Sequence, residues 1–320
     1  MQEQAHRPKL IFLVTEDWYF WSHRLPMARA AQAAGFEVAV ATRVAEHGER
    51  IRAAGFTLHP LRWRRANLGP WSACRAIAEI ARLYRRERPL LVHHIALKPS
   101  VFGGIAALLA RVPAVINTVT GVGSIASARS LKARLLRAPV LLALTRLLER
   151  ENSRIVVQNA DDLALLSSFN PAARSRIVII RGSGVDTGSL TPGPPPGSPP
   201  VIAGFAGRLL VDKGVPVLIE AQQRLQARGV DLHLWLAGAP DPENPSSIDA
   251  ATLAAWRTLK GVRWLGHLAD IRALWSKVHI AVLPSRREGL PKSLLEAASM
   301  GLPLIATDVP GCRDIAVAGV

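Results

Sequence analysis

Short apolar segments alternate with amphipathic segments along nearly the whole chain, and this alternation most constrains the fold. Apolar runs such as residues 9–14, 91–95 and 232–237 are typical of parallel strands, which are buried because helices cover both faces of their sheet. A helical pattern follows each run, as in residues 24–34 after the first strand. The chain is therefore predicted to be an α/β protein built on doubly wound parallel sheets.

A segment dense in glycine, proline and serine, residues 182–200, divides this alternation into two series. Such a composition is typical of a linker. We expect a first Rossmann-like domain over residues 1–185, a linker over 186–200 and a second Rossmann-like domain over 201–320. Ligands of such sheets bind at the carboxyl ends of the strands, so the candidate site residues are sought there.

The charge is strongly positive and unevenly distributed. The formal net charge is +16, and residues 1–190 hold 27 basic against 13 acidic side chains. Such a surface suits a polyanion, which could be a nucleic acid, an anionic membrane or a phosphate-rich substrate. Two cysteines give no disulfide framework, and no secretory signal or apolar stretch of about 18 residues is visible. A cytoplasmic protein is expected.

Two carboxylates near the end of the chain are candidate ligand-binding groups. Glu288 precedes a predicted helix, and Glu296 lies inside it among apolar neighbours. Gly289 and Leu290 place bare backbone at the helix N-terminus, which suits an anion or an oxygen-rich ligand. A partly buried carboxylate needs partners, and sugar hydroxyls would serve. The simpler alternative is a helix-start acid followed by a solvated glutamate.

Two cations flank the loop after the first strand of the second domain. Arg208 and Lys213 lie near the N-terminus of the next helix. Fixed cations and aligned N–H groups are what a diphosphate needs. By itself this spacing also fits an ordinary basic surface loop.

Three further candidates come from the first domain. His93 and His94 end a strand, and because adjacent residues face opposite sides, at least one is expected to be packed inside. Asp17, Ser22 and His23 belong to an aromatic-rich loop, where they could bind an acceptor hydroxyl or cap a helix. Gly121 follows another strand and lies in a flexible loop beside the acceptor or in a plain turn. No metal site is predicted.

The segment around Glu288 and Glu296 resembles the signature of retaining glycosyltransferases of family 4, which have the GT-B fold. The motif consists of a loop Glu, seven intervening residues, a helix Glu and then the sequence GLPLIATDVPG. Other motifs, including D-W-x-x-x-S-H-R-L-P, H-H-x-x-x-K-P and Q-N-A-D-D, resemble those of a subgroup that builds capsule, O-antigen or related bacterial glycans on a lipid-diphosphate carrier.

The resemblance implies two Rossmann-like domains that face each other across a cleft holding the active site. The donor would be a nucleotide-sugar, most plausibly a UDP-sugar, with its ribose on Glu296 and its diphosphate on Arg208 and Lys213. Glu288, Gly289 and Leu290 would contact the sugar, together with a histidine at the position of His93 or His94. The acceptor would be a lipid-diphosphate-linked sugar, and no cofactor or metal would be needed.

The implied enzyme would work at the inner face of the plasma membrane as a peripheral protein. Family members usually continue beyond the point that corresponds to residue 320, so an incomplete second domain is expected. Two alternatives remain open from the sequence: a basic non-catalytic protein that binds membrane or nucleic acid, and a GT-B-fold sugar-nucleotide epimerase. Nucleic acid is the least favoured partner, because no recognised motif or aromatic platform is found.

Overall fold

The structure is a computed structural model that describes residues 7–63, 69–119, 145–146, 150–197 and 199–319. It divides into two compact units, Met1–Ser183 and Gly184–Val320. Residues 184–197, which include most of the expected linker 186–200, group with the second unit. Leu190 is buried, and its carbonyl oxygen accepts a hydrogen bond of 2.6 Å from Ser299 Oγ.

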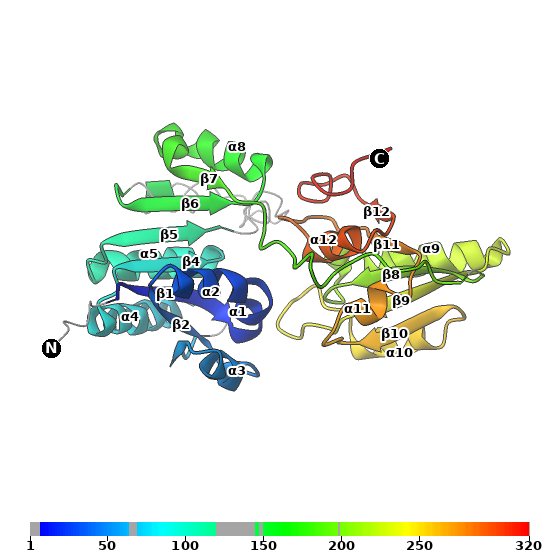
Figure 1. Cartoon of the computed structure of the whole chain (residues 1–320), viewed down its shortest axis with the longest axis horizontal. Helices are drawn as coiled ribbons and strands as arrows, with labels where there is room; N and C mark the ends of the chain where they lie inside the picture. Colours follow the sequence, from blue (N-terminus) through cyan, green and yellow to red (C-terminus); the bar gives the residue numbers. More distant parts are fainter. Residues whose placement is uncertain (1–6, 64–68, 120–144, 147–149, 198, 320) are drawn as a thin grey trace. The chain divides into compact units, whose positions relative to one another are not determined.

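The first unit is a parallel sheet with strand order β3-β2-β1-β4-β5-β6-β7 among the described residues (Figure 1). The strands are β1 Lys9–Glu16, β2 Glu37–Arg43, β3 Thr57–Pro60, β4 Leu91–Ile95, β5 Ala114–Thr118, β6 Ser153–Val157 and β7 Ile177–Ile179. The helices are α1 Asp17–His23, α2 Leu25–Ala33, α3 Gly48–Ala53, α4 Pro70–Glu87, α5 Leu97–Leu109 and α8 Ala160–Phe169, with a 3₁₀ turn η1 Pro171–Arg176.

Strand β1 explains why this sheet has helices on both faces. Ile11 and Leu13 pack in one core cluster with buried residues of α4 and α5. Leu10, Phe12 and Val14 point the other way, into a cluster with Phe20 of α1 and Ala28 of α2. Side chains alternate along a strand, so a continuous apolar run fills two cores at once.

The aromatic segment after β1 is a helix, which corrects the expected loop. Strand β1 runs to Glu16 and α1 begins at once at Asp17. Phe20 is fully buried and packs edge-on against Phe12 and Phe56. Apolar packing of this face onto the sheet stabilises a helix of two turns, which is too short to be stable alone.

The second unit repeats the plan with strand order β10-β9-β8-β11-β12, all parallel. Its strands are β8 Val201–Ala206, β9 Leu232–Ala237, β10 Val262–Gly266, β11 Ile280–Leu283 and β12 Leu304–Ala306. Its helices are α9 Val215–Ala227, α10 Ala250–Arg257, α11 Arg272–Trp275 and α12 Lys292–Ser299, with a 3₁₀ turn η2 Val211–Lys213. Two core clusters lie on the faces of this sheet.

Two Rossmann-like units with parallel sheets confirm the predicted fold class. Among the described residues, no helix has the length and apolar character needed to cross a bilayer.

Candidate functional site

The two motifs of the second unit meet at one edge of its sheet. Strands β8 and β11 are parallel neighbours, so the loops that follow them leave the sheet side by side. Lys213 in η2 and Glu288 in the loop after β11 form an ion pair through Nζ and Oε1, although 75 positions separate them. The glutamate side chain is only 9% exposed. The structure therefore brings together two residues that the sequence predicted separately.

A glycine makes this meeting of the loops possible. Gly214 has a φ of +75°, and a Cβ at this position would collide with the backbone of Pro284 at the end of β11. Only glycine combines this backbone conformation with so close an approach.

Arg208 lies two residues beyond β8 and also has an acidic partner. Its Nη1 lies 2.6 Å from Oδ2 of Asp241, in the loop that follows β9. The arginine side chain is 40% exposed, whereas that of Asp241 is 13% exposed. A cation with part of its surface in solvent can accept a second oxyanion through its remaining N–H groups.

Glu296 is a buried carboxylate rather than a solvated one. It lies in α12, which begins at Lys292 just after Pro291, and its residue exposure is 9%. Burial raises the pKa of Glu296, and this effect is partly offset by Lys292, whose Nζ lies 3.3 Å from Oε1. Such a carboxylate can accept hydrogen bonds from ligand hydroxyls with little competition from water.

The loop that carries Glu288, Gly289 and Leu290 is held by the segment after β12. A Cβ at Gly311 would lie 2.7 Å from the Gly289 carbonyl carbon and 3.1 Å from the Glu288 carbonyl oxygen. The neighbouring Cys312 is buried, and burial followed by the charge of Glu288 raises the pKa of its thiol to about 12. The thiol is therefore protonated and serves as packing.

The two adjacent histidines have different surroundings. His94 is fully buried between α4 and α5, where Nδ1 donates to Asn117 Oδ1 at 2.8 Å and Nε2 lies 3.1 Å from the Tyr84 hydroxyl. Burial lowers the pKa of His94 to about 4. A Cβ on Gly103 would come within 2.6 Å of this ring, which shows how closely the helix packs. We therefore withdraw His94 as a catalytic candidate, because no substrate can reach it in this core.

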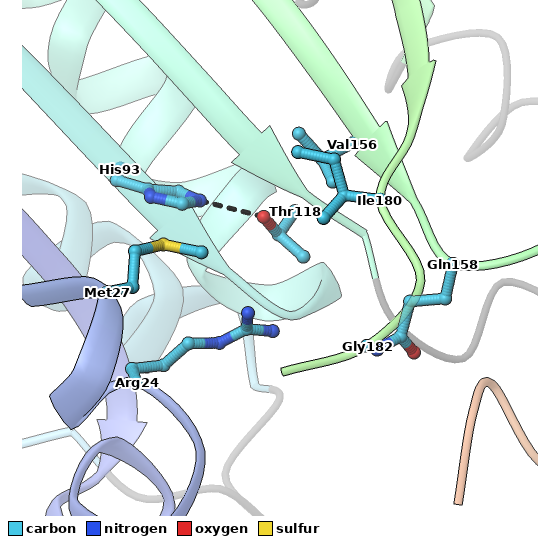
Figure 2. A pocket seen from close by; sticks show the side chains of 8 residues that line it. All are labelled: Arg24, Met27, His93, Thr118, Val156, Gln158, Ile180 and Gly182. Carbon is cyan, nitrogen blue, oxygen red and sulfur yellow. Dashed lines mark hydrogen bonds between the residues drawn. The ribbon is translucent and has the colours of Figure 1, made fainter. Parts of the chain in front are cut away.

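His93 points to the opposite face and lines a pocket at the carboxyl end of the first sheet (Figure 2). Its Nε2 lies 2.7 Å from Thr118 Oγ1. Burial, with smaller contributions from Arg24 and His94, lowers its pKa to about 3. The ring is therefore neutral at physiological pH and can exchange a hydrogen bond with a ligand.

Several pocket residues were not predicted from the sequence. The pocket is lined by Arg24, Met27, His93, Thr118, Val156, Gln158, Ile180 and Gly182. Thr118 and Gln158 stand at or just after the ends of β5 and β6, so a search of polar residues at strand ends would have found them. Arg24 lies between α1 and α2, and no spacing signal distinguishes it among 40 basic residues.

Asp17 has a structural task that differs from the predicted acceptor contact. Its carboxylate is fully buried, and Oδ2 accepts hydrogen bonds of 2.8–2.9 Å from the backbone N–H groups of Ala45, Glu46 and His47. Its Oδ1 accepts from Trp18 N. We therefore interpret Asp17 as a residue that positions the loop after β2.

Ser22 and His23 lie at the end of α1, where Ser22 Oγ is 2.6 Å from His23 Nδ1 and the His23 ring stacks on Tyr19. Ser22 is exposed and His23 is half-buried, so both remain candidates for an acceptor contact. Gly121 lies outside the described residues. In the described part of the chain, no group of three or more His, Cys, Asp or Glu side chains could hold a metal ion.

Two protein-family models match the chain, one in each unit. Residues 9–159 match the family described as "Glycosyl transferase 4-like", and residues 200–320 match "Glycosyl transferases group 1". Together these matches span most of the sequence and include each side chain assigned above to the two candidate sites, apart from the last residues of the histidine pocket.

Curated relatives carry names of the same class. The chain is 26% identical over 304 residues to the N,N'-diacetylbacillosaminyl-diphospho-undecaprenol alpha-1,3-N-acetylgalactosaminyltransferase of Campylobacter jejuni, a match that covers 91% of this chain and 78% of the relative. It is 29% identical over 118 residues to the capsular polysaccharide biosynthesis glycosyltransferase CapM of Staphylococcus aureus, covering 37% of this chain and 30% of that one.

Solved structures show the same fold. HepE of Anabaena, in complex with UDP and glucose, superposes with a TM-score of 0.74 at 17% identity, over 98% of this chain and 84% of that one. A sucrose-phosphate synthase of Thermosynechococcus elongatus superposes with a TM-score of 0.73 at 17% identity, over 96% and 83%. The architecture is that of GT-B glycosyltransferases. Both units match glycosyltransferase family models, and a relative named for the same activity class matches 91% of the chain, so the chain is a glycosyltransferase with the GT-B fold.

Proposed function

We propose that the protein transfers a sugar from a nucleotide-sugar, in particular a UDP-sugar, to a lipid-diphosphate-linked or glycan acceptor, with retention of the anomeric configuration. The observation that carries this proposal is the cluster at one sheet edge of the second unit. There Arg208, Lys213, Glu288 and buried Glu296 offer two cations and two carboxylates within a single pair of loops and one helix. A diphosphate flanked by two hydroxyl-rich sugars needs this set of groups.

Each group has a role in this proposal. Glu296 accepts hydrogen bonds from the ribose hydroxyls, and its low exposure makes these bonds strong. Arg208 and Lys213 bind the diphosphate and stabilise the charge that develops on it. Glu288 with the backbone of Gly289 and Leu290 contacts the donor sugar.

His93 is the histidine assigned to the reaction, because His94 is enclosed in the core. Its ring is neutral at physiological pH, which suits a hydrogen bond to a sugar hydroxyl. The protein needs no metal for this chemistry in our proposal, because the two cations replace it at the leaving group.

In the proposed reaction, both bond changes take place on one face of the donor sugar. The acceptor hydroxyl oxygen forms a bond to the anomeric carbon on the face from which the diphosphate leaves, while the bond from that carbon to the phosphate oxygen breaks. The hydroxyl proton passes to the departing phosphate oxygen, and the electron pair of the broken bond stays on the diphosphate. No side-chain base is required, and retention results because both events occur on one face.

The acceptor class is supported by the relatives and by the charge of the first unit. The Campylobacter jejuni relative is named for an undecaprenol-diphosphate-linked acceptor, and CapM for capsular polysaccharide biosynthesis. Helix α4 carries Arg82, Arg85 and Arg86 on its exposed face, and Trp71 near its start is 86% exposed. A basic helix with an exposed tryptophan suits an anionic lipid surface, so we propose peripheral association with the inner face of the plasma membrane.

The donor site is tested by calorimetric titration of UDP, GDP and ADP against the purified chain and against Glu296→Ala. We expect UDP to bind best and the variant to lose about tenfold or more, as for the loss of hydrogen bonds to a charged group. No binding of any nucleotide to the wild-type chain would contradict the proposal. The product anomer, assigned by NMR, tests retention, and transfer in EDTA tests the independence from metal.

A further inference from the structure

Arg24 is a buried cation in the histidine pocket, and no acidic partner for it is found among the described residues. It joins α1 to α2, and its residue exposure is 2%. In the described part of the chain no carboxylate forms an ion pair with it, and its Nε has no hydrogen-bond partner. Its positive charge helps to lower the pKa of the neighbouring His93.

An unpaired buried charge is costly, and folded proteins normally compensate it. The other arginines and lysines at the candidate sites obey this rule: Arg208, Lys213 and Lys292 each have a carboxylate within ion-pair distance. Arg24 does not, although it is more buried than they are. Its surroundings therefore favour an anion that the described part of the chain does not provide.

The pocket has the other features of a site for such an anion. Figure 2 shows the guanidinium of Arg24 directed toward the space beside Thr118, with Gln158 and Gly182 across from it. The pocket is small, with a cavity volume of about 20 Å³, and it opens partly to solvent. Met27, Val156 and Ile180 form apolar walls, which lower the local dielectric and strengthen an ionic contact.

We propose that Arg24 binds a phosphoryl group of a substrate in this pocket, with Thr118 and Gln158 as neutral hydrogen-bonding partners. A guanidinium is suited to this task because it donates two parallel hydrogen bonds to phosphate oxygens. The inference rests on the proposed function, in which both substrates carry a diphosphate. The phosphoryl group belongs either to the lipid-linked acceptor or to the nucleotide donor, and the experiment separates the two.

The experiment compares Arg24→Met and Arg24→Lys with Arg29→Met, all in the full chain. Arg29 is an exposed arginine of the neighbouring helix α2, so its replacement makes the same change of charge and volume away from the pocket. The acceptor probes are a short-chain polyprenyl diphosphate sugar and the same sugar as an alkyl glycoside without phosphate. The donor probe is UDP. Each is titrated calorimetrically, and thermal unfolding is recorded without ligand.

We expect Arg24→Met to weaken one diphosphate-bearing probe by tenfold or more, with an intermediate loss for Arg24→Lys and none for Arg29→Met. The alkyl glycoside should bind all variants equally. Loss confined to the polyprenyl diphosphate assigns the acceptor, and loss confined to UDP assigns the donor. The ligand-free Arg24→Met chain should unfold at the wild-type temperature or above, because an uncompensated charge has been removed.

Unchanged affinity of Arg24→Met for both diphosphate-bearing probes would overturn the inference. A fall in its unfolding temperature together with an equal loss of affinity for the phosphate-free alkyl glycoside would show a packing role and would also overturn it. Failure of the proposed function looks different. In that case the wild-type chain would bind UDP no better than Glu296→Ala does, whatever the result at Arg24.

Discussion

Gly311 supports the loop of Glu288 and Gly289, and its replacement by alanine tests whether that loop must be held in place. The residue has a φ of +81°, which costs an L-amino acid about 1–2 kcal/mol. The new Cβ would stand 2.7 Å from the Gly289 carbonyl carbon, where ordinary contacts begin at 3.4 Å. The loop must therefore shift by about 1 Å, and a misplacement of that size lowers turnover by about 10²-fold.

Gly229→Ala is the matched control for this variant. Gly229 has a φ of +78°, but a Cβ there meets no atom within 4 Å. Both variants carry the same backbone cost, which lowers Tm by several degrees in a unit of this size, and only Gly311→Ala also displaces the loop. Overpacking adds about 1–3 kcal/mol to the loss of stability in that variant.

The assays are thermal unfolding, UDP titration and sugar transfer. We expect Gly229→Ala to lose stability while keeping the wild-type transfer rate, and Gly311→Ala to lose more stability and about 99% of its turnover, which is the 10²-fold effect above. Equal transfer rates in the two variants would refute the reasoning, because the position of the loop would then not depend on Gly311.

Three further predictions concern single side chains. Glu296→Gln should weaken UDP binding yet raise stability at pH 7.5. Burial raises the pKa of Glu296 above its ordinary value of 4.5, so its charge destabilises the folded unit increasingly as pH rises above 4.5 and has no such effect below that value. Urea unfolding of both chains at pH 4 and 7.5 would reveal the difference. His94 has a pKa of about 4 in the folded unit against 6.5 when unfolded, so its contribution to stability is complete above pH 6.5 and is lost as pH falls toward 4. His94→Gln should therefore make the free energy of unfolding less dependent on pH in this range, as measured by denaturant titrations. An unchanged pH dependence would contradict the burial of a neutral His94. Asp17→Asn should destabilise the first unit by about 2–3 kcal/mol, because several N–H donors lose a charged acceptor, while UDP titration should find unaltered affinity in the second unit.

The strands were predictable because their apolar runs serve two cores at once. The pattern at residues 9–14 and 232–237 has no other economical interpretation in a chain with helical segments between the runs. The helix Asp17–His23 was not predictable, because seven residues are too few for a periodic signal and its stability comes from Phe20 packing on the sheet. The expected end of the first domain, residue 185, lies close to the division at residues 183 and 184. The packing of Leu190 on the second unit could not be predicted, because it depends on the tertiary structure.

Some of the site residues could likewise be predicted from the sequence, and others depend on the folded structure. Glu288, Glu296, Arg208 and Lys213 follow strand ends in a recognisable order, so their neighbourhood could be predicted even though their pairing could not. The choice between His93 and His94 depends on which sheet face α4 and α5 cover, and neither residue's sequence context contains that information. Arg24 was missed for another reason: it is distinguished by having no acidic partner among the residues that the structure describes, and this is a property of the folded unit alone.

The ion pairs of Arg208 with Asp241 and of Lys213 with Glu288 have a consequence for selectivity. Each cation already forms an ion pair with a carboxylate of the chain. An incoming anion must displace that carboxylate, so its binding free energy is only the difference between the two ionic contacts. Singly charged anions and small free phosphates gain little from this exchange, whereas a diphosphate that engages both cations at once and is anchored by its nucleoside gains from two exchanges and one docking event. In the proposed donor site, the two carboxylates would thus make binding selective for a nucleoside diphosphate over the simple anions that are abundant in a cell.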